Sequence, residues 1–162
     1  PSLDLRRVPA GRVARFAVRW GVQRGALGGG LVFGASFGVN GRLYDERHVA
    51  ITMALGSVQE WTVGFDSDLI ARAAGLSHPF HIHVNAFQIV GIRAPNGSEY
   101  AGGYGGNGVL GRVGDWRDTL ETPVGGAFTM RFVAADFAGK FPFHCHEAQH
   151  ADYGMQANAV VE

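Results

Sequence analysis

Two short histidine clusters are the feature that most constrains how this chain folds. Six of the seven histidines in the 162-residue sequence lie in the segments 78–83 and 144–150, and the only cysteine, Cys145, lies inside the second segment. In an extended strand, residues i and i+2 project to the same face and residue i+1 projects to the other. Extended backbone would therefore put Cys145 on one face and its two histidine neighbours on the opposite face. The pairs expected to share a face are His81 with His83, and His144 with His146.

The residues around Cys145 supply the ligands of one metal. Imidazole, thiolate and thioether together form the ligand set of a blue-copper electron-transfer centre, in which the methionine is a weak axial ligand. His150 lies five residues after Cys145, and Met155 lies five residues after His150. A loop of this length can bring both side chains back to the metal, and Gly154 permits a tight bend just before the methionine. With His78, which stands where a loop ends and a strand begins, the predicted mononuclear set is His78, Cys145, His150 and Met155.

Four further histidines remain, which is more than one copper can use. They form two His-x-His pairs: His81, His83, His144 and His146. We therefore predict copper redox chemistry with more than one type of copper, linked by a short covalent route from the thiolate of Cys145 through the backbone to its neighbours. Zinc also accepts cysteine and histidine, but the methionine and the surplus pairs favour copper. His48 is isolated in the sequence and is not expected to be a ligand.

Length and composition fit one domain over residues 1–162. A chain of this size buries roughly 70% of its unfolded surface. The formal net charge is zero and the basic residues are scattered, so no nucleic-acid-binding stripe or polybasic membrane anchor is expected. No apolar run approaches the roughly 20 residues of a membrane-spanning helix. One cysteine allows no internal disulfide, so cysteine content does not identify the compartment. The start at Pro1, without a signal peptide, fits a mature, trimmed or partial chain.

The residue pattern predicts an all-β sandwich or barrel. Glycine is abundant, and Val, Phe, Thr and Ile recur in short runs between turn residues. Asn40-Gly41 predicts a hairpin turn, and the strands over 49–55 and 58–65 are expected to pair around Gly56-Ser57. The Gly-rich segment 97–114 lacks the strand-then-helix context of a phosphate loop. Helical turns are predicted only over 66–76, and the remaining strands are predicted over 12–20, 80–92, 127–133, 141–146 and 156–161.

With these motifs, the chain resembles the C-terminal cupredoxin domain of multicopper oxidases, the group that includes laccases and ascorbate oxidase. The most specific signatures are His-Pro-x-His-x-His and His-Cys-His-x3-His-x4-Met. The likeness extends from about Phe33 to Val161, and it includes the stretch 115–119, which is similar to the family's Trp-Lys-Asp-Thr. The resemblance implies a cupredoxin-like Greek-key β-sandwich or barrel with a short helical segment.

The resemblance also implies a role for each ligand. His78, Cys145 and His150 would hold the type 1 copper, with Met155 axial. His81 would hold the type 2 copper, and His83, His144 and His146 the type 3 pair. In the family, the type 1 copper takes electrons from a small reducing substrate, either a phenol or a metal ion. The trinuclear cluster of type 2 and type 3 coppers then reduces dioxygen to water.

The chain departs from the family pattern in its supply of ligands. A trinuclear cluster needs two more His-x-His pairs from an N-terminal cupredoxin domain, and only His48 remains here. We therefore expect that partner domain to be absent from this chain and to come from the same oxidase or from another subunit.

Glu147 stands where the family usually has an aliphatic residue, and Asp152 is a candidate proton donor. Asp118 and Thr119 are expected to be structural or to support a ligand. The resemblance implies a secreted or periplasmic protein.

Two other functions remain open. A stand-alone blue-copper module would use only the type 1 site and pass electrons between partners. A copper nitrite reductase is also built of cupredoxin domains. It is disfavoured because the His-Cys-His triplet supplies two imidazoles on one face, as a type 3 pair requires and a single catalytic copper does not.

Overall fold

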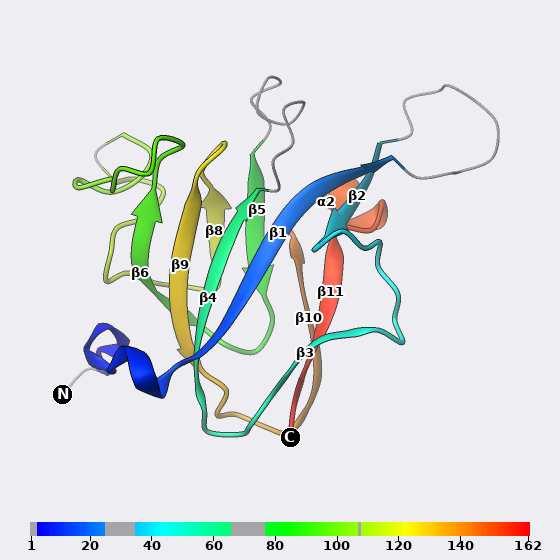
Figure 1. Cartoon of the computed structure of the whole chain (residues 1–162), viewed down its shortest axis with the longest axis horizontal. Helices are drawn as coiled ribbons and strands as arrows, with labels where there is room; N and C mark the ends of the chain where they lie inside the picture. Colours follow the sequence, from blue (N-terminus) through cyan, green and yellow to red (C-terminus); the bar gives the residue numbers. More distant parts are fainter. Residues whose placement is uncertain (1–2, 25–34, 66–76, 107) are drawn as a thin grey trace.

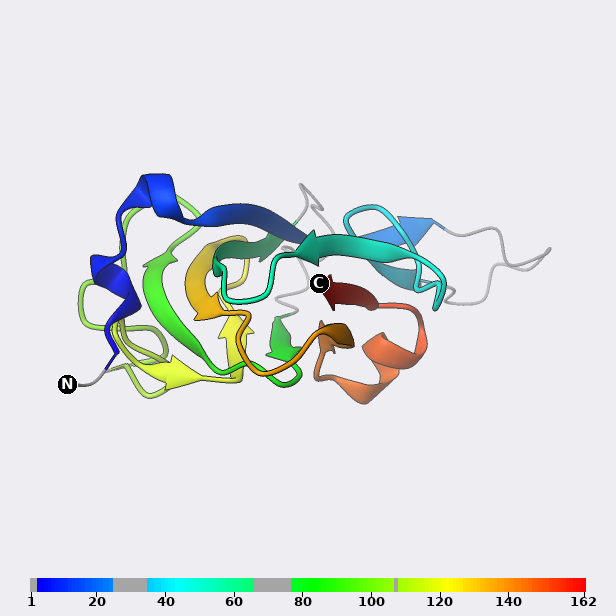
Figure 2. The same ribbon diagram turned by 90° about the horizontal axis from the view of Figure 1, so that it is seen from below.

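Two β-sheets pack face to face and enclose one hydrophobic core (Figures 1 and 2). The computed structural model describes residues 3–24, 35–65, 77–106 and 108–162. The first sheet has the strand order β2-β1-β4-β9-β6-β7, and the second has the order β3-β11-β10-β5-β8. The strands are β1 Ala14–Arg24, β2 Ala35–Val39, β3 Val49–Met53, β4 Val58–Phe65, β5 His78–Ile82, β6 Phe87–Arg93, β7 Trp116–Arg117, β8 Thr119–Thr122, β9 Ala127–Val133, β10 Gly139–Cys145 and β11 Gln156–Val161.

The helical elements among the described residues are short. Two 3-10 turns, η1 (Leu5–Arg7) and η2 (Ala10–Arg12), precede β1, and one α-helical turn, α2 (Ala148–Asp152), connects β10 to β11. None of the described helices is long and apolar enough to cross a membrane. The predicted helical turns over 66–76 lie outside the described residues. The prediction that helical turns occur only there is wrong, because η1, η2 and α2 form elsewhere.

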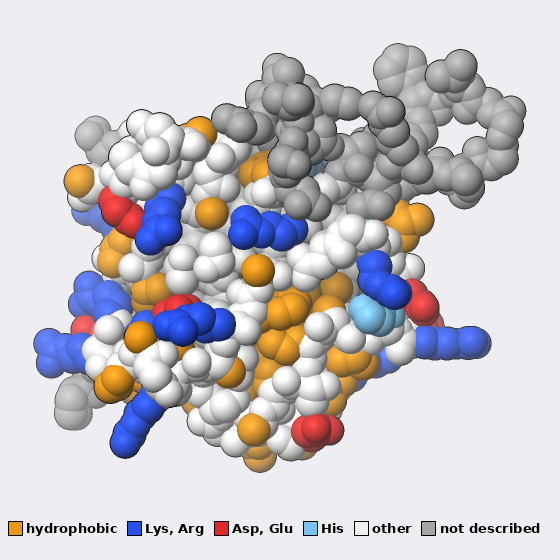
Figure 3. Space-filling view, in the orientation of Figure 1, with side chains coloured by type: hydrophobic (Ala, Val, Ile, Leu, Met, Phe, Trp, Pro, Cys, Tyr) orange, Lys and Arg blue, Asp and Glu red, His pale blue; other side chains and the backbone are white. Residues whose placement is uncertain are grey.

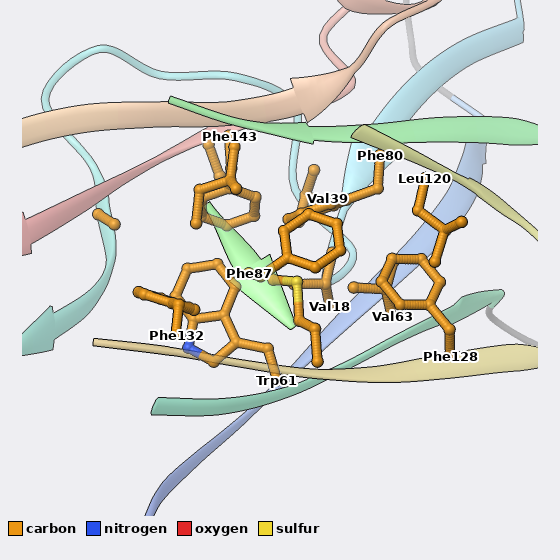
Figure 4. Close-up of a cluster of buried hydrophobic side chains, with 14 of the residues drawn as sticks. Val18, Val39, Trp61, Val63, Phe80, Phe87, Leu120, Phe128, Phe132 and Phe143 are labelled. Atoms are coloured by element: carbon orange, nitrogen blue, oxygen red, sulfur yellow. The ribbon is translucent and has the colours of Figure 1, made fainter. Parts of the chain in front are cut away.

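Alternating side chains explain the two-layer arrangement. In β4, Gln59, Trp61 and Val63 are buried, while the residues between them are partly exposed. Successive side chains of a strand point to opposite faces, so this pattern gives β4 one face toward the core. Figure 4 shows the aromatic side chains that the two sheets bring together there, including Trp61 from β4 and Phe143 from β10. Their ring centroids are 5.0 Å apart.

The predicted fold class is confirmed, and three strand predictions match the observed bounds. The segments 58–65, 127–133 and 156–161 coincide with β4, β9 and β11. The number and spacing of such strands predicted the all-β sandwich, and the resemblance implied its cupredoxin-like form. β7 and β8 were not predicted.

The predicted pairing of 49–55 with 58–65 is wrong. β3 pairs with β11 in the second sheet, while β4 pairs with β1 and β9 in the first. The connection crosses between the layers: Leu55 donates its N–H to the carbonyl of Glu162, and Gly56 donates to the carbonyl of Ala134. Because both amides are satisfied by other segments, Gly56-Ser57 forms a crossover and not a hairpin turn.

The single strand predicted over 80–92 is also wrong. The chain forms β5 and β6 in different sheets, with a bend over 83–86 in which Val84 has φ +69°. A positive φ is costly for a β-branched residue and interrupts the extended backbone. Apolar and polar residues alternate from Phe80 to Ala86, which is the pattern of one continuous strand, so the residue pattern does not mark this break.

The predicted turn at Asn40-Gly41 is present, but its hairpin is minimal. Asn40 and Gly41 have φ +51° and +75°, the conformation that a tight primed turn requires. The pairing after the turn is a single bridge between Val39 and Arg42. The main partner of β2 is instead β1.

The outer side of the first sheet carries separated charges. Lys and Arg side chains are spread over the face in Figure 3. Several arginines of this sheet are paired: Arg15 and Arg131 both contact Glu60, at 3.0 and 2.6 Å. Arg131 also donates to the backbone carbonyls of Leu5 and Val8, which holds the segment before β1 against the sheet.

Phe143 is the core residue whose truncation is expected to cost most near the second histidine cluster. It is fully buried and packs against the rings of Trp61 and Phe80. Phe143→Ala should lower the free energy of unfolding by about 3–5 kcal/mol, because it removes buried area and leaves a cavity. Urea unfolding of the metal-free chain measures this loss. Val109→Ala, at a side chain that is 77% exposed, should change the free energy by less than about 0.5 kcal/mol. Equal effects of the two changes would contradict the assignment of the core.

Candidate metal centre

The pairing of β5 with β10 sorts the histidines onto two faces. His144 lies opposite His81, and Cys145 lies opposite Phe80. Burial alternates along both strands, with His78 and Cys145 among the buried positions. His78 and Cys145 therefore point into the sandwich, while His81 and His144 lie on the outer face of the second sheet.

His78, Cys145 and His150 form what we call the inner cluster. Their ligand atoms are close: His78 Nδ1 lies 3.0 Å from His150 Nδ1, and Cys145 Sγ lies 3.7 Å from each of these nitrogens. A circle through the three atoms has a radius of about 2.0 Å, close to the length of metal bonds to imidazole nitrogen and thiolate sulfur, about 2.0–2.3 Å. The three side chains therefore fit a single metal ion.

The turn after Cys145 brings His150 and Met155 back to the cluster. The chain passes through α2, which carries His150, and Met155 then donates its N–H to the carbonyl of His150. Cys145 donates its N–H to the carbonyl of Met155 at 3.0 Å, and Met155 is fully buried. Gly154 has φ +107°, and a Cβ there would lie 2.9 Å from the carbonyl oxygen of Phe37. The bend before the methionine therefore requires glycine for both conformation and space.

Aromatic side chains wall the inner cluster. The ring of Phe37 lies 4.2 Å from that of His150, and the rings of Phe65 and Trp20 lie 5.2 and 6.1 Å from that of His78. Trp20 satisfies its own indole N–H by donating to the hydroxyl of Thr122. The cluster is thus surrounded by apolar surface, which limits the access of water to a bound metal.

Burial keeps the inner cluster uncharged at neutral pH. It lowers the pKa of His78 to about 4, with a smaller contribution from the nearby His150. Burial also raises the pKa of the Cys145 thiol to about 12, a hydrogen bond from the Glu147 backbone opposes the rise, and the carboxylates of Glu121 and Glu147 add to it. The imidazoles are therefore ready to donate lone pairs, while a metal must displace the thiol proton.

His81, His83, His144 and His146 form what we call the outer cluster. Ligand atoms of His81, His83 and His144 all lie within 4.8 Å of one another, and the Nε2 atoms of His83 and His144 are 3.1 Å apart. The ring of His146 lies 5.3 Å from that of His81. His83 and His146 are exposed, so the cluster opens away from the sandwich. Partial loss of hydration, small at the exposed His83 and larger at His144, lowers the pKa values of both residues, and neighbouring imidazoles lower them further.

The two clusters meet at the backbone of Cys145. His144 Nδ1 lies 2.8 Å from the Cys145 carbonyl oxygen. A carbonyl only accepts hydrogen bonds, so Nδ1 of His144 carries the proton and Nε2 keeps the lone pair. Two routes, one covalent and one through this hydrogen bond, therefore connect the thiol to the outer cluster.

All the sequence-predicted ligands gather at these two clusters, whereas His48 lies elsewhere. His48 lines a surface cavity of about 220 Å³ together with Arg42 and Asp45. Glu147 and Asp152 are both exposed, and the charge of Glu147 acts on Cys145 and His150. The aromatic wall could not be predicted from the sequence, because Phe37, Phe65 and Trp20 come from distant segments and carry no local signal.

The free energy of unfolding of the metal-free chain should fall as the pH is lowered from 6.5 to 4. The pKa of His78 is about 4 in the folded chain, against an ordinary value of 6.5, so the unfolded chain takes up a proton that the folded chain does not. This stabilisation is complete above pH 6.5 and is lost toward pH 4. The lowered pKa values of His83, His144 and His150 act in the same direction.

His78→Asn tests this assignment, because it removes one of the protons taken up on unfolding. Urea titrations across the same pH range should give a slope that is smaller by about 1.4 kcal/mol per pH unit. A slope equal to that of the unsubstituted chain would show that His78 is not the buried neutral group described here.

Comparison with known proteins connects this geometry to a family. The multicopper oxidase family model matches residues 18–162. A laccase from Haloferax volcanii is 26% identical over 124 residues, covering 76% of this chain and 19% of the relative. A bilirubin oxidase from Albifimbria verrucaria is 29% identical over 132 residues, covering 79% of this chain and 21% of the relative. The chain therefore spans about a fifth of the length of these curated relatives.

A similar fold is found among solved structures. The structure of a multicopper oxidase from Campylobacter jejuni, described as a metallo-oxidase, matches with a TM-score of 0.70 and 24% identity, covering 95% of this chain and 31% of that chain. A laccase from Pediococcus acidilactici matches with a TM-score of 0.67 over 93% of this chain and 27% of that chain, at 24% identity. These likenesses support the cupredoxin-like fold. Since the family model covers nearly the whole sequence, the chain belongs to the multicopper oxidase family.

Proposed function

We propose that this chain is the domain of a laccase-like multicopper oxidase that accepts electrons at the inner cluster and delivers them to the outer cluster. The observation that carries the proposal is the position of the two clusters, back to back on one strand end. Cys145 reaches the inner cluster, while His144 reaches the outer cluster on the opposite face. A protein with a single metal site would not need two clusters joined through neighbouring residues.

The inner cluster is proposed as the type 1 copper site, with Met155 as the axial ligand. The ligand atoms fit one ion, and the thiol and thioether groups are soft ligands that suit copper. The surrounding rings of Phe37, Phe65 and Trp20 exclude water and hold both imidazoles in place. His78 and His150 stay neutral at neutral pH and are available to bind, while Cys145 gives up its proton when a metal binds.

The outer cluster is proposed as one half of a trinuclear site, with His81 for the type 2 copper and His83, His144 and His146 for the type 3 pair. Bound copper would supply one-electron chemistry at the inner cluster and reduction of dioxygen to water at the outer cluster. His83 and His144 fit the same ion, since their Nε2 atoms lie 3.1 Å apart. The exposed imidazoles of His83 and His146 are available to a facing domain or subunit that completes the site.

The chain's own residues provide the route between the clusters. The covalent path runs from the Cys145 sulfur through its backbone to His144 on one side and His146 on the other. The hydrogen bond from His144 Nδ1 to the Cys145 carbonyl offers a second connection. A small reducing substrate, a phenol or a metal ion, would deliver electrons near His150, the inner ligand that is only partly buried.

A stand-alone blue-copper electron-transfer module is the second candidate. The observation in its favour is that this chain supplies every ligand of the inner cluster by itself. In that case the outer cluster would play no part in function, and no domain or subunit would be needed. The two candidates differ in the copper content and oxygen chemistry of the completed protein.

Cys145→Ser tests the inner cluster. The unsubstituted chain, loaded with cupric ion, should bind one copper at this site and show an intense thiolate-to-copper absorption band in the visible region. The serine variant should lack the band, because its hydroxyl is not a thiolate donor. His48→Asn serves as the matched control and should keep the full band, since His48 lies outside both clusters. A band that survives in the serine variant would refute the assignment.

Oxygen consumption separates the two candidates. Combined with the domain or subunit that supplies the missing histidines, the chain should bind four coppers in total and consume dioxygen in the presence of a phenolic donor. His144→Ala should abolish this consumption while leaving the visible band of the inner cluster in place. A completed protein that holds a single copper and cycles reversibly without consuming dioxygen would favour the stand-alone module instead.

A further inference from the structure

Thr119 contacts a ring nitrogen of His81, a histidine of the outer cluster. His81 Nδ1 lies 2.8 Å from the hydroxyl of Thr119 and 3.0 Å from the backbone carbonyl of Asp118. Thr119 is the cross-strand partner of His81 in the pairing of β8 with β5. Both acceptors therefore approach the same ring nitrogen, one from β8 and the other from the residue just before β8.

These contacts select one form of the His81 ring. A backbone carbonyl only accepts, so the nitrogen facing Asp118 must carry the hydrogen. In a neutral imidazole, a proton on Nδ1 leaves the lone pair on Nε2, which is then the metal-binding atom. The Thr119 hydroxyl accepts a hydrogen bond from the same N–H, which leaves its own O–H free to donate to another acceptor.

The two acceptors are themselves held in place. The Asp118 carbonyl also accepts the backbone N–H of Ile82 at 3.2 Å, which ties it to the end of β5. Threonine is β-branched and has few side-chain conformations in a strand. The hydroxyl is thus presented at a fixed point beside the ring.

The His81 ring is bonded to a side-chain hydroxyl as well as to a backbone carbonyl. The His144 ring is oriented by a backbone carbonyl alone, that of Cys145. Within the described part of the chain, His81 is the outer-cluster imidazole whose far nitrogen is bonded to a side-chain hydroxyl. Its orientation therefore depends on the identity of residue 119 and not only on the course of the backbone.

We propose that Thr119 is a positioning residue that holds the His81 ring with Nδ1 protonated and Nε2 turned toward the metal of the outer cluster. The inference rests on the proposed role of His81 as a metal ligand. Partners that bond the far nitrogen of a metal-binding histidine fix its orientation and typically contribute about 10–100-fold to metal affinity. Because the Asp118 carbonyl remains when the hydroxyl is removed, we expect the lower end of that range.

The test compares Thr119→Val, which removes the hydroxyl at nearly constant shape, with Thr119→Ser, which keeps it. All variants carry Cys145→Ser and His150→Asn, so that the inner cluster does not compete for metal. Zinc is the probe, because imidazole binds it and it undergoes no redox change. Nitrogen-15 NMR of the metal-free chains reports which nitrogen of His81 carries the proton, a readout that a merely structural role would leave unchanged.

Thr119→Val should weaken zinc binding about tenfold and lower the fraction of His81 in the Nδ1–H form below that of the parent, because the Asp118 carbonyl then remains as the one acceptor of the two. Thr119→Ser should match the parent in both measurements. Thr129→Val is the matched control: Thr129 is a half-buried threonine of β9 in the other sheet, and its replacement should change neither measurement.

Two other outcomes would overturn the inference in distinguishable ways. If Thr119→Val matches the parent in tautomer and affinity, Thr119 has no positioning role, while the copper assignment of the outer cluster stands. If His81→Asn binds zinc as tightly as the parent, His81 is not a ligand, and the proposed outer cluster fails together with the inference.

Discussion

The antiparallel pairing of β5 with β10 is the constraint on which both clusters depend. It sets His144 against His81 and Cys145 against Phe80, and the N–H of His146 extends the pairing to the carbonyl of Pro79. Because side chains alternate along a strand, a register slip of one residue would exchange the buried and exposed sets. The thiol would then face outward and the outer imidazoles would enter the core. The register is therefore specified by the metal ligands and by the hydrophobic core at once.

The core supplies the rigidity that this pairing needs. Phe80 and Phe143 flank the paired residues on the inner face and pack against Trp61 and the other aromatic rings of the sandwich. Cys145 and Met155 are buried as deeply as these rings, so the inner cluster is a part of the core. In the absence of metal, burial disfavours the charged forms of both residues, the protonated imidazole of His78 and the thiolate of Cys145. The metal-free cluster therefore holds neutral imidazoles and a thiol in apolar surroundings, and these groups are suited to bind a soft metal ion.

The two clusters differ in how far the chain completes them. The inner cluster draws His78, Cys145 and His150 from β5, β10 and α2, and the turn through Gly154 then returns Met155 to Cys145. The outer cluster lies on an open sheet face, where His83 and His146 are exposed and Thr119 supports His81 from the edge strand. This asymmetry, together with the larger size of the family members, leads us to propose an oxidase assembled from more than one domain or subunit.

The candidate ligands, their division between two faces and the all-β class could be predicted from the sequence. Alternating geometry in a strand is a local property, so the His-x-His and His-Cys-His spacings already separate the thiol from its neighbours. The pairing of β3, the break between β5 and β6, and the conformation of the turn before Met155 could not be predicted in this way. They depend on hydrogen bonds such as that from Leu55 to Glu162, which join residues far apart in the chain.

The sequence by itself therefore determined the chemistry of the ligands and the face to which each one points. Tertiary structure alone decided how close they lie, which rings enclose them and which nitrogen of His81 and of His144 is available to a metal. The physical reason is that distances of 3.0 to 3.7 Å between His78, His150 and Cys145 arise from the packing of β5, β10 and α2. No spacing along a single strand can specify contacts of that kind.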